Sequence, residues 1–420
     1  MGLSPLLFVH QHFPTYRLAD IRGEVWAQLD RARLDQGLRP GASIAIGVGS
    51  RGIANLAEIV GSAVAWWKAR GMEPFLFPAM GSHGAATARG QAEVLAKFGI
   101  TPETMGCAIR SSLAVQPLGE TPEGIPVVLD RLAWQSDGIM LCGRVKWHTD
   151  FAGRLESGLF KMMAIGLGKF AGAQTYHAFG DRLGLEQVIR SAGRHLLATG
   201  KILGGLAILE DAHHDTARLE ALTPANMEAR EMELLELVKT WMPTIPLPAL
   251  DIVIVNQMGK PISGSGLDTK IINRNVSAEY NPWPGAPVIR RVYVRALHPL
   301  SYGNAVGIGF ADAVHRRLAR AVKRAPTYLN ALTSNNPAAA RIPINYDSDR
   351  RCLEVLAATV GKLNPAEVTI GWIHDTQDLR QLAFTANLRA EIEARSQLEI
   401  TSGPREWPFD LQGNLPLDLP

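Results

Sequence analysis

The chain has few cysteines, no long apolar run and no block of like charge, and each absence excludes a class of protein. Its three cysteines, Cys107, Cys142 and Cys352, lie far apart and form no CxxC pair. This excludes a disulfide scaffold and a thiolate zinc site, and it favours a reducing compartment. No apolar run reaches the roughly 18 residues of a membrane span, and the N-terminus lacks the pattern of a signal peptide. We therefore expect a cytoplasmic protein that does not bind membranes.

The charge and the length set two further limits. The formal net charge is only +3, with no charged block, so nothing in the sequence indicates a nucleic-acid partner. Apolar residues make up 46% of the chain and charged residues 20%, which is enough apolar material for a packed core. Because 420 residues exceed one ordinary core, we expect two domains.

Short apolar runs alternate with segments of helical periodicity, which predicts an α/β fold with largely parallel sheets. The proline-rich stretch "MPTIPLPALD" is the best candidate linker. We predict an N-terminal α/β domain over residues 1–245, a C-terminal α/β domain over residues 246–405 and an extended tail over residues 406–420. The active site is expected in the cleft between the two domains. We also expect a helix within residues 379–396.

Two similar glycine-rich loops follow predicted strands in the first half of the chain. Gly49-Ser50-Arg51-Gly52 follows the apolar run 43–48, and Gly81-Ser82-His83-Gly84 follows the run 73–80. The loops are 32 positions apart, about one βαβ unit, so both should emerge at the same edge of a parallel sheet. Glycine lets the backbone approach a ligand closely, and the helix starts that follow offer N–H groups to an anion.

Two more predicted strands end in polar residues. His148 follows the run 137–143, and the strand 251–257 is followed by "MGKPISGSG", which contains Lys260. Ligands of open α/β sheets bind beyond the carboxyl ends of the strands, so these strand ends should converge on a site. The segment 146–177 is otherwise glycine, alanine and medium-sized apolar residues, yet it contains His148, Lys161 and His177.

These motifs resemble the nickel-pincer nucleotide-dependent lactate racemase family, from about Ser43 to about Lys260. The most specific matches are "GSRGIAN" and "MGSHGAAT". Members of that family attach a sulfur-substituted pyridinium mononucleotide to a lysine, and its nickel is bound by carbon, two sulfurs and one histidine. The cofactor takes a hydride from a 2-hydroxy acid and returns it to either face of the 2-oxo acid. The resemblance therefore implies an isomerase, a racemase or an epimerase.

The resemblance also assigns roles to residues. It makes His83 and His148 the acid–base pair, Lys161 the lysine joined to the cofactor, and His177 the nickel ligand. The other residues that it places at the site are Ser50 and Ser82 for the cofactor, and Arg51, Gln257 and Lys260 for the substrate. The implied partners are a small 2-hydroxy acid and the enzymes that build the cofactor; a homo-oligomer is left open.

The departures from the family concern the substrate more than the cofactor. The lactate enzymes have Asp-His-Thr before their arginine, whereas this chain has Val48-Gly49-Ser50. They follow the histidine of the second loop with arginine, whereas Gly84 stands here. Smaller neighbours leave more room, and an unfilled gap forfeits packing energy. We therefore expect a substrate bulkier than lactate, whose side-chain class the sequence leaves open.

Elementary chemistry agrees with these roles. Racemisation needs proton transfer on both faces of one carbon, and histidine exchanges protons near neutral pH. Burial of Lys161 among apolar neighbours favours the nucleophilic amine. A nicotinamide-dependent oxidoreductase and a non-catalytic nucleotide- or metabolite-binding protein remain alternatives, although neither glycine loop is a GxGxxG. "EDAHHDT" (210–216) is expected to be a polar turn, and Trp66-Trp67 to be packing residues.

Overall fold

The computed structural model describes residues 2–49, 52–275 and 279–419. The chain divides into two compact units, Pro14–Met242 and Met1–Phe13 together with Pro243–Pro420. Both contain helices and a largely parallel sheet, which confirms the predicted α/β class. Residues 1–13, which we placed in the N-terminal domain, belong instead with the C-terminal part of the chain. The placement of the site between domains stays a prediction.

The unit Pro14–Met242 is built on a five-stranded sheet in the order β3-β2-β6-β7-β8. Its strands are β2 (Ser43–Val48), β3 (Glu73–Pro78), β6 (Gly138–Arg144), β7 (Ile202–Glu210) and β8 (Thr216–Leu222). All pairings are parallel except the last, between β7 and β8. The central strands are apolar and almost wholly buried, as expected for parallel strands covered on both faces.

Helices cover both faces of this sheet. The remaining elements of the unit are α1 (Ile21–Ala32), α2 (Leu56–Ala69), α3 (Ala88–Lys97), α4 (Pro102–Met105), β4 (Val115–Glu120), β5 (Pro126–Asp130), α5 (Arg131–Trp134), α6 (Leu159–Lys161), α7 (Lys169–Leu183), α8 (Leu185–Ala198) and α9 (Met227–Trp241). One core cluster joins the sheet to α1 and α2 and contains Trp66 and Trp67, both fully buried, which confirms their expected packing role. The other joins it to α6, α8 and α9.

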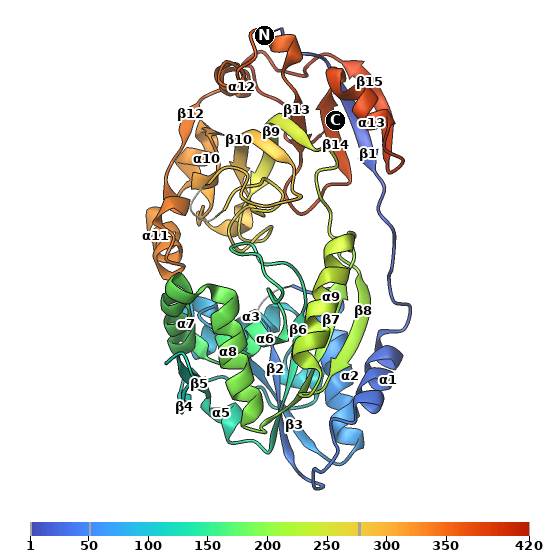
Figure 1. Ribbon diagram of the computed structural model, residues 1–420, viewed down its shortest axis with the longest axis vertical. Helices are drawn as coiled ribbons and strands as arrows, with labels where there is room; N and C mark the ends of the chain where they lie inside the picture. The colour runs from blue at the N-terminus through green and yellow to red at the C-terminus, as the bar shows by residue number, and fades with distance from the viewer. Residues whose placement is uncertain (1, 50–51, 276–278, 420) are drawn as a thin grey trace. The chain divides into compact units, whose positions relative to one another are not determined.

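The second unit has an eight-stranded sheet in the order β12-β11-β10-β9-β13-β14-β1-β15. The strands are β1 (Leu6–Gln11), β9 (Ala249–Met258), β10 (Val288–Leu297), β11 (Ala313–His315), β12 (Ile344–Tyr346), β13 (Ile370–Ile373), β14 (Gln381–Thr385) and β15 (Leu398–Arg405). β9 to β13 pair in parallel, whereas β14, β1 and β15 are antiparallel to their neighbours. Figure 1 shows β1, in blue, among the red strands of the C-terminal region.

Four α-helices accompany this sheet: α10 (Arg316–Ala321), α11 (Arg324–Thr333), α12 (Asp349–Ala357) and α13 (Arg389–Glu393). The predicted helix within residues 379–396 is wrong in its first half, which forms strand β14. The reason is tertiary, because β14 pairs with both β1 and β13 and buries four of its five residues. None of the helices in the described residues is long and apolar enough to cross a membrane.

Residues 406–419 have little regular structure, yet hydrogen bonds join them to the sheet. The guanidinium of Arg295 on β10 donates to the carbonyls of Leu415, at 2.6 Å, and Pro416, at 2.8 Å. The carboxylate of Asp349, which is fully buried, accepts from the backbone N–H of Leu415 at 2.8 Å. The C-terminal segment is therefore part of the packed unit.

Candidate active site

Three neighbouring parallel strands deliver the candidate residues of the unit Pro14–Met242 to one edge of its sheet. β3, β2 and β6 lie side by side and run in the same direction. The loops that contain His83 and His148 therefore emerge at the same edge, as the sequence predicted. Ser50 and Arg51, in the loop after β2, lie outside the described residues.

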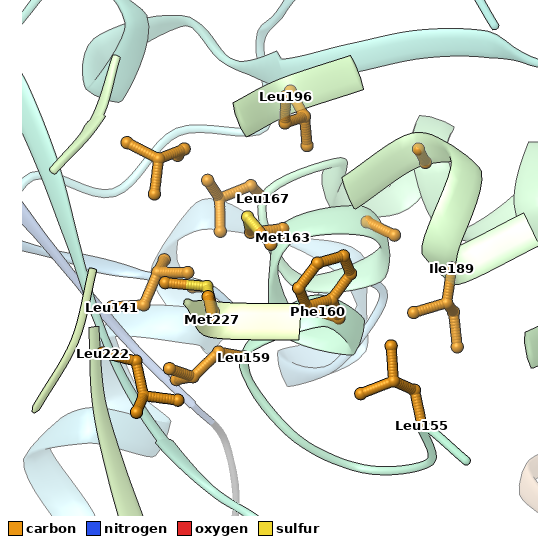
Figure 2. Packing of buried hydrophobic residues seen from close by; sticks show 14 of the residues in the cluster. Leu141, Leu155, Leu159, Phe160, Met163, Leu167, Ile189, Leu196, Leu222 and Met227 are labelled. Atoms are coloured by element: carbon orange, nitrogen blue, oxygen red, sulfur yellow. The ribbon is translucent and has the colours of Figure 1, made fainter. Parts of the chain in front are cut away.

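Lys161 ends the short helix α6, which continues into a π-helical turn, η2 (Met162–Gly166). Figure 2 shows Leu159, Phe160 and Met163 among the apolar residues of the core cluster. All three are fully buried, whereas Lys161 is half-buried. The apolar neighbours thus anchor the backbone on both sides of the half-buried lysine. Single π-turns inside helices occur often at functional sites.

Glycines at the strand ends make room for this helical segment. A Cβ added at Gly143, on β6, would meet the methyl group of Met162 at 2.9 Å, and one at Gly49 would meet it at 3.4 Å. The N–H of Gly81, in the loop after β3, donates to the carbonyl of Gly166 at 3.3 Å. The segment that contains Lys161 therefore lies directly against the ends of all three strands.

Glu231 caps the helix that contains Lys161. Gly158 precedes α6 and has no side chain to cap it, so its first N–H groups need another acceptor. The Glu231 carboxyl, from α9, accepts from the N–H of Leu159 at 2.8 Å and of Phe160 at 3.2 Å. Glu231 is fully buried, and burial raises its pKa to about 7. The Oε1 atom of Glu231 has no hydrogen-bond partner, so a proton there would disturb no contact.

His148 and Lys161 are in direct contact: Nζ lies 2.5 Å from Nε2. The other ring nitrogen of His148, Nδ1, accepts from the backbone N–H of Asp150 at 3.0 Å. A neutral imidazole with an accepting Nδ1 has its proton on Nε2. In this arrangement Nε2 donates to Lys161, which requires the unprotonated amine. The arrangement therefore favours the form of lysine that can attack an electrophile.

The residues around His148 hold it in place. The backbone N–H of His148 donates to Glu156 at 2.6 Å, and the Glu156 carboxylate also pairs with Lys239 at 3.1 Å. The ring of Phe151 lies 4.6 Å from the imidazole, centroid to centroid. His148 itself is buried, with 7% of its surface exposed. A buried imidazole fixed at both its backbone and its ring is suited to directed proton transfer.

His177 lies on α7 and is half-buried. Burial is the largest cause that lowers the pKa of its imidazole below the ordinary 6.5; a positive charge on Lys161 would add to this shift, but the unprotonated amine that the contact with His148 favours carries none. The carboxylates of Asp150 and Asp181 oppose this shift. A neutral imidazole, which is the form that binds metals, is thus favoured near Lys161. The described residues contain no group of three or more His, Cys, Asp or Glu side chains that could hold a metal ion.

His83 lies on the surface at the start of a 3-10 turn, η1 (Gly84–Ala86). Its loop depends on two glycines with positive φ, Gly81 at 58° and Gly84 at 63°. A Cβ at Gly84 would meet the backbone nitrogen of Gln91 at 2.5 Å, so no other residue fits there without a shift. The half-buried Ser82 lies between Gly81 and His83. The glycines thus hold the loop tightly against helix α3.

Gln257 and Lys260 belong to the other unit of the chain, where they lie at the end of β9. The backbone N–H of Gln257 donates to the carbonyl of His374, at the end of the neighbouring strand β13. Lys260 donates through Nζ to the carbonyl of Gly264 at 2.6 Å. The sequence reasoning missed Glu231, which resembles any polar residue of an amphipathic helix.

The polar turn expected at 210–216 is present between β7 and β8. Asp211 accepts from the backbone N–H groups of His213 and Asp215, at 3.0 and 3.1 Å. Glu210 pairs with Arg144 and accepts from the N–H of Ala54 at 2.8 Å. These acidic groups are thus occupied in fixing the loops at the sheet edge.

Two solved structures share this fold. One is a lactate racemase apoprotein from Thermoanaerobacterium thermosaccharolyticum, with a TM-score of 0.52 at 14% identity over 87% of this chain and 99% of that chain. The other is a structural-genomics protein from Thermotoga maritima, with a TM-score of 0.52 at 13% identity over 78% of this chain and 84% of that chain. No family model and no curated protein matches the chain. The chain therefore has a lactate racemase-like fold.

Proposed function

We propose that this protein is an isomerase that racemises or epimerises a 2-hydroxy acid. The observation that carries the proposal is the contact of Lys161 Nζ with His148 Nε2, at 2.5 Å, close to the imidazole of His177. An amine and two imidazoles at the edge of a parallel sheet supply an attachment point, an acid–base group and a metal ligand. The similarity in fold to a protein named as a lactate racemase supports the same class of reaction.

The residues fit a covalently attached nickel-pincer nucleotide. Lys161 would hold it through its amine, whose unprotonated form the contact with His148 favours. His177 would bind the nickel, since imidazole is a good ligand for that metal and its pKa is lowered. One ligand from the protein suffices only if the cofactor brings the others, which agrees with the lack of a larger ligand group in the described residues. When bound, the group supplies the acceptor and donor of the hydride.

His148 would move the proton of the substrate hydroxyl on one side, and His83 on the other. In the described arrangement Nε2 of His148 holds a proton that it can donate. To act as a base, Nε2 must be unprotonated, so the ring proton must then be on Nδ1. The Asp150 carboxylate lies 4.0 Å from Nδ1 and can stabilise that form. Asp150 would therefore help His148 to alternate between acid and base.

Lys260, with Arg51, would supply the positive charge that binds the substrate carboxylate, and Gln257 would donate to its oxygens. The backbone of α3 fills the space beside Gly84, and the methyl group of Met162 lies 3.4 Å from the Cβ position of Gly49, so neither glycine opens space for a substrate. We propose a substrate bulkier than lactate on the sequence differences from the lactate enzymes alone. The enzymes that assemble the cofactor are the implied partners.

The test is the mass of the intact protein after co-expression with cofactor-maturation enzymes. Wild type should gain the mass of one nucleotide, K161A should gain none, and H177A should gain the nucleotide but retain less nickel. K161A removes the amine to which the nucleotide is attached, whereas H177A removes one metal ligand and leaves the attachment intact. Full nickel occupancy in K161A, or an unmodified wild-type mass, would contradict the proposal. Racemisation by the loaded wild type, measured with a panel of 2-hydroxy acids, then identifies the substrate.

A further inference from the structure

Lys169 is a charged residue in the core of the unit Pro14–Met242, and neither acid–base chemistry nor cofactor attachment uses it. Its side chain is fully buried, as is that of its ion-pair partner Asp130, whose carboxylate lies 2.9 Å from Nζ. Burial lowers the pKa of Lys169, and the charge of Asp130 opposes that shift. Burying a charge pair is expensive, and apolar residues of similar size are often as stable or better. Stability alone therefore does not explain why this ion pair is buried.

The contacts of Lys169 lead to the loop of His83. Nζ donates to the carbonyl of Pro78, at the end of β3, at 2.5 Å and to the Gln91 side-chain oxygen at 3.3 Å. The fully buried Gln91 side chain in turn donates to the carbonyls of Gly81, at 2.8 Å, and His83, at 3.3 Å. An unbroken chain of polar contacts thus runs from Asp130 to the backbone of His83.

The same lysine also fixes the start of helix α7. Lys169 is its first residue and has a φ of 55°, in the left-handed region that costs a residue with a side chain about 1 kcal/mol or more. It follows directly on the helical segment of Lys161 and precedes His177 by two turns of α7. One buried amine therefore joins the loop of His83 to the helical run that contains Lys161 and His177.

We propose that Lys169, Gln91 and Asp130 are positioning residues, which hold the loop of His83 in register with the helix of His177. The inference rests on the proposed function for the roles of those two histidines, whereas the network itself is a feature of the fold. Catalysis depends on such register because a misplacement of about 1 Å can lower a rate by about 10²-fold. Gln91 is the best residue to change, because the ion pair between Lys169 and Asp130 remains when Gln91 is replaced.

The test compares Q91M and Q91E with the control R89A, which changes an exposed residue on the same helix. Q91M removes every polar contact at a similar volume, and Q91E keeps an oxygen for Lys169 but cannot donate to the two carbonyls. We expect hydrogen exchange of the amides in residues 81–87 to become about tenfold faster in both, as for one lost hydrogen bond. Exchange in β2 and β6 should stay unchanged, and R89A should match wild type.

The same variants are then loaded with cofactor and assayed. If the network positions His83, kcat should fall on the order of 10²-fold while KM changes little, because substrate binding does not depend on the register of one acid–base group. Faster exchange in a protein whose wild type shows no racemisation would support the network and refute the proposed function. Unchanged exchange in residues 81–87, in folded Q91M or Q91E, would overturn the positioning role.

Discussion

Glu231 shows what burial does to a single carboxyl group. It lies on α9 with no exposed surface, accepts two backbone N–H groups of α6, and has a pKa raised from 4.5 to about 7. Desolvation is the dominant cause, and the two hydrogen bonds only reduce it. The group caps the helix of Lys161 in both protonation states, because its unpartnered Oε1 can take the proton.

This shift makes stability depend on pH in a defined direction. A raised folded-state pKa stabilises the protein fully below pH 4.5, and this contribution is lost as the pH rises through about 7. At about 1.4 kcal/mol per pKa unit, the loss is about 3 kcal/mol. Between pH 5 and pH 8 the free energy of unfolding of wild type should therefore fall by about 2–3 kcal/mol relative to E231Q.

Denaturant unfolding at several pH values measures this difference, and E233Q, at an exposed position of the same helix, is the matched control. Parallel pH profiles for wild type and E231Q would show that Glu231 is not the titrating group.

At the scale of single residues, the sequence suggested candidates for the chemistry but not the residues that support them. The spacing of Lys161 and His177 and the apolar run around them led to their proposed roles. Nothing in the sequence separates Gln91 or Glu231 from ordinary polar residues of amphipathic helices. Their importance depends on which backbone groups they meet, and residues 8 to 72 positions away decide that.

At the scale of elements, the segment α6–η2 changes from an α-turn to a π-turn and is closely packed at its start. Gly158, before α6, has no room for a side chain, since a Cβ there would lie 2.1 Å from the Oε1 atom of Glu231. The flexible side chain would have to move, and with it the cap on Leu159 and Phe160. A side chain at position 158 would therefore displace the Glu231 carboxyl from the N–H groups that it caps.

We expect G158A to destabilise the protein by about 1–3 kcal/mol, the usual cost of overpacking. G180A, within helix α7, meets its nearest neighbour at an ordinary 3.4 Å and should be neutral or stabilising by up to about 1 kcal/mol. Thermal or denaturant unfolding of both variants measures the contrast. Equal stability of G158A and wild type would mean that the Glu231 side chain can move and still accept hydrogen bonds from the first N–H groups of α6.

At the scale of the whole molecule, one unit is made of two separate segments of the chain, Met1–Phe13 and Pro243–Pro420, and the other unit, Pro14–Met242, lies between them in the sequence. β1 lies between β14 and β15, and β15 pairs with no strand but β1 in the described residues. Leu6, Leu7 and Val9 of β1 are fully buried. β1 (Leu6–Gln11) is therefore an interior strand of a sheet otherwise made of residues 249–405.

Deleting residues 2–12 should consequently destabilise the unit that contains residues 243–420 and spare residues 14–242. The deletion leaves β15 without a partner and exposes an edge of β14. Limited proteolysis with mass spectrometry should show early cleavage within residues 243–420 and a protected fragment from residues 14–242. Equal protection of both regions would contradict an interior role for β1.

The sequence by itself determined the α/β class and the strand-end loops and led to the proposed site residues, because apolar periodicity, glycine positions and residue chemistry are local properties. The tertiary structure decided that residues 381–385 form a strand, that β1 joins a distant sheet and that Lys169 is buried beside Asp130. Each of these depends on a partner far along the chain, and pairing or burial outweighs the local preference of a segment. For that reason the sequence alone led to the proposed reactive residues, and only the fold identified the residues that support them.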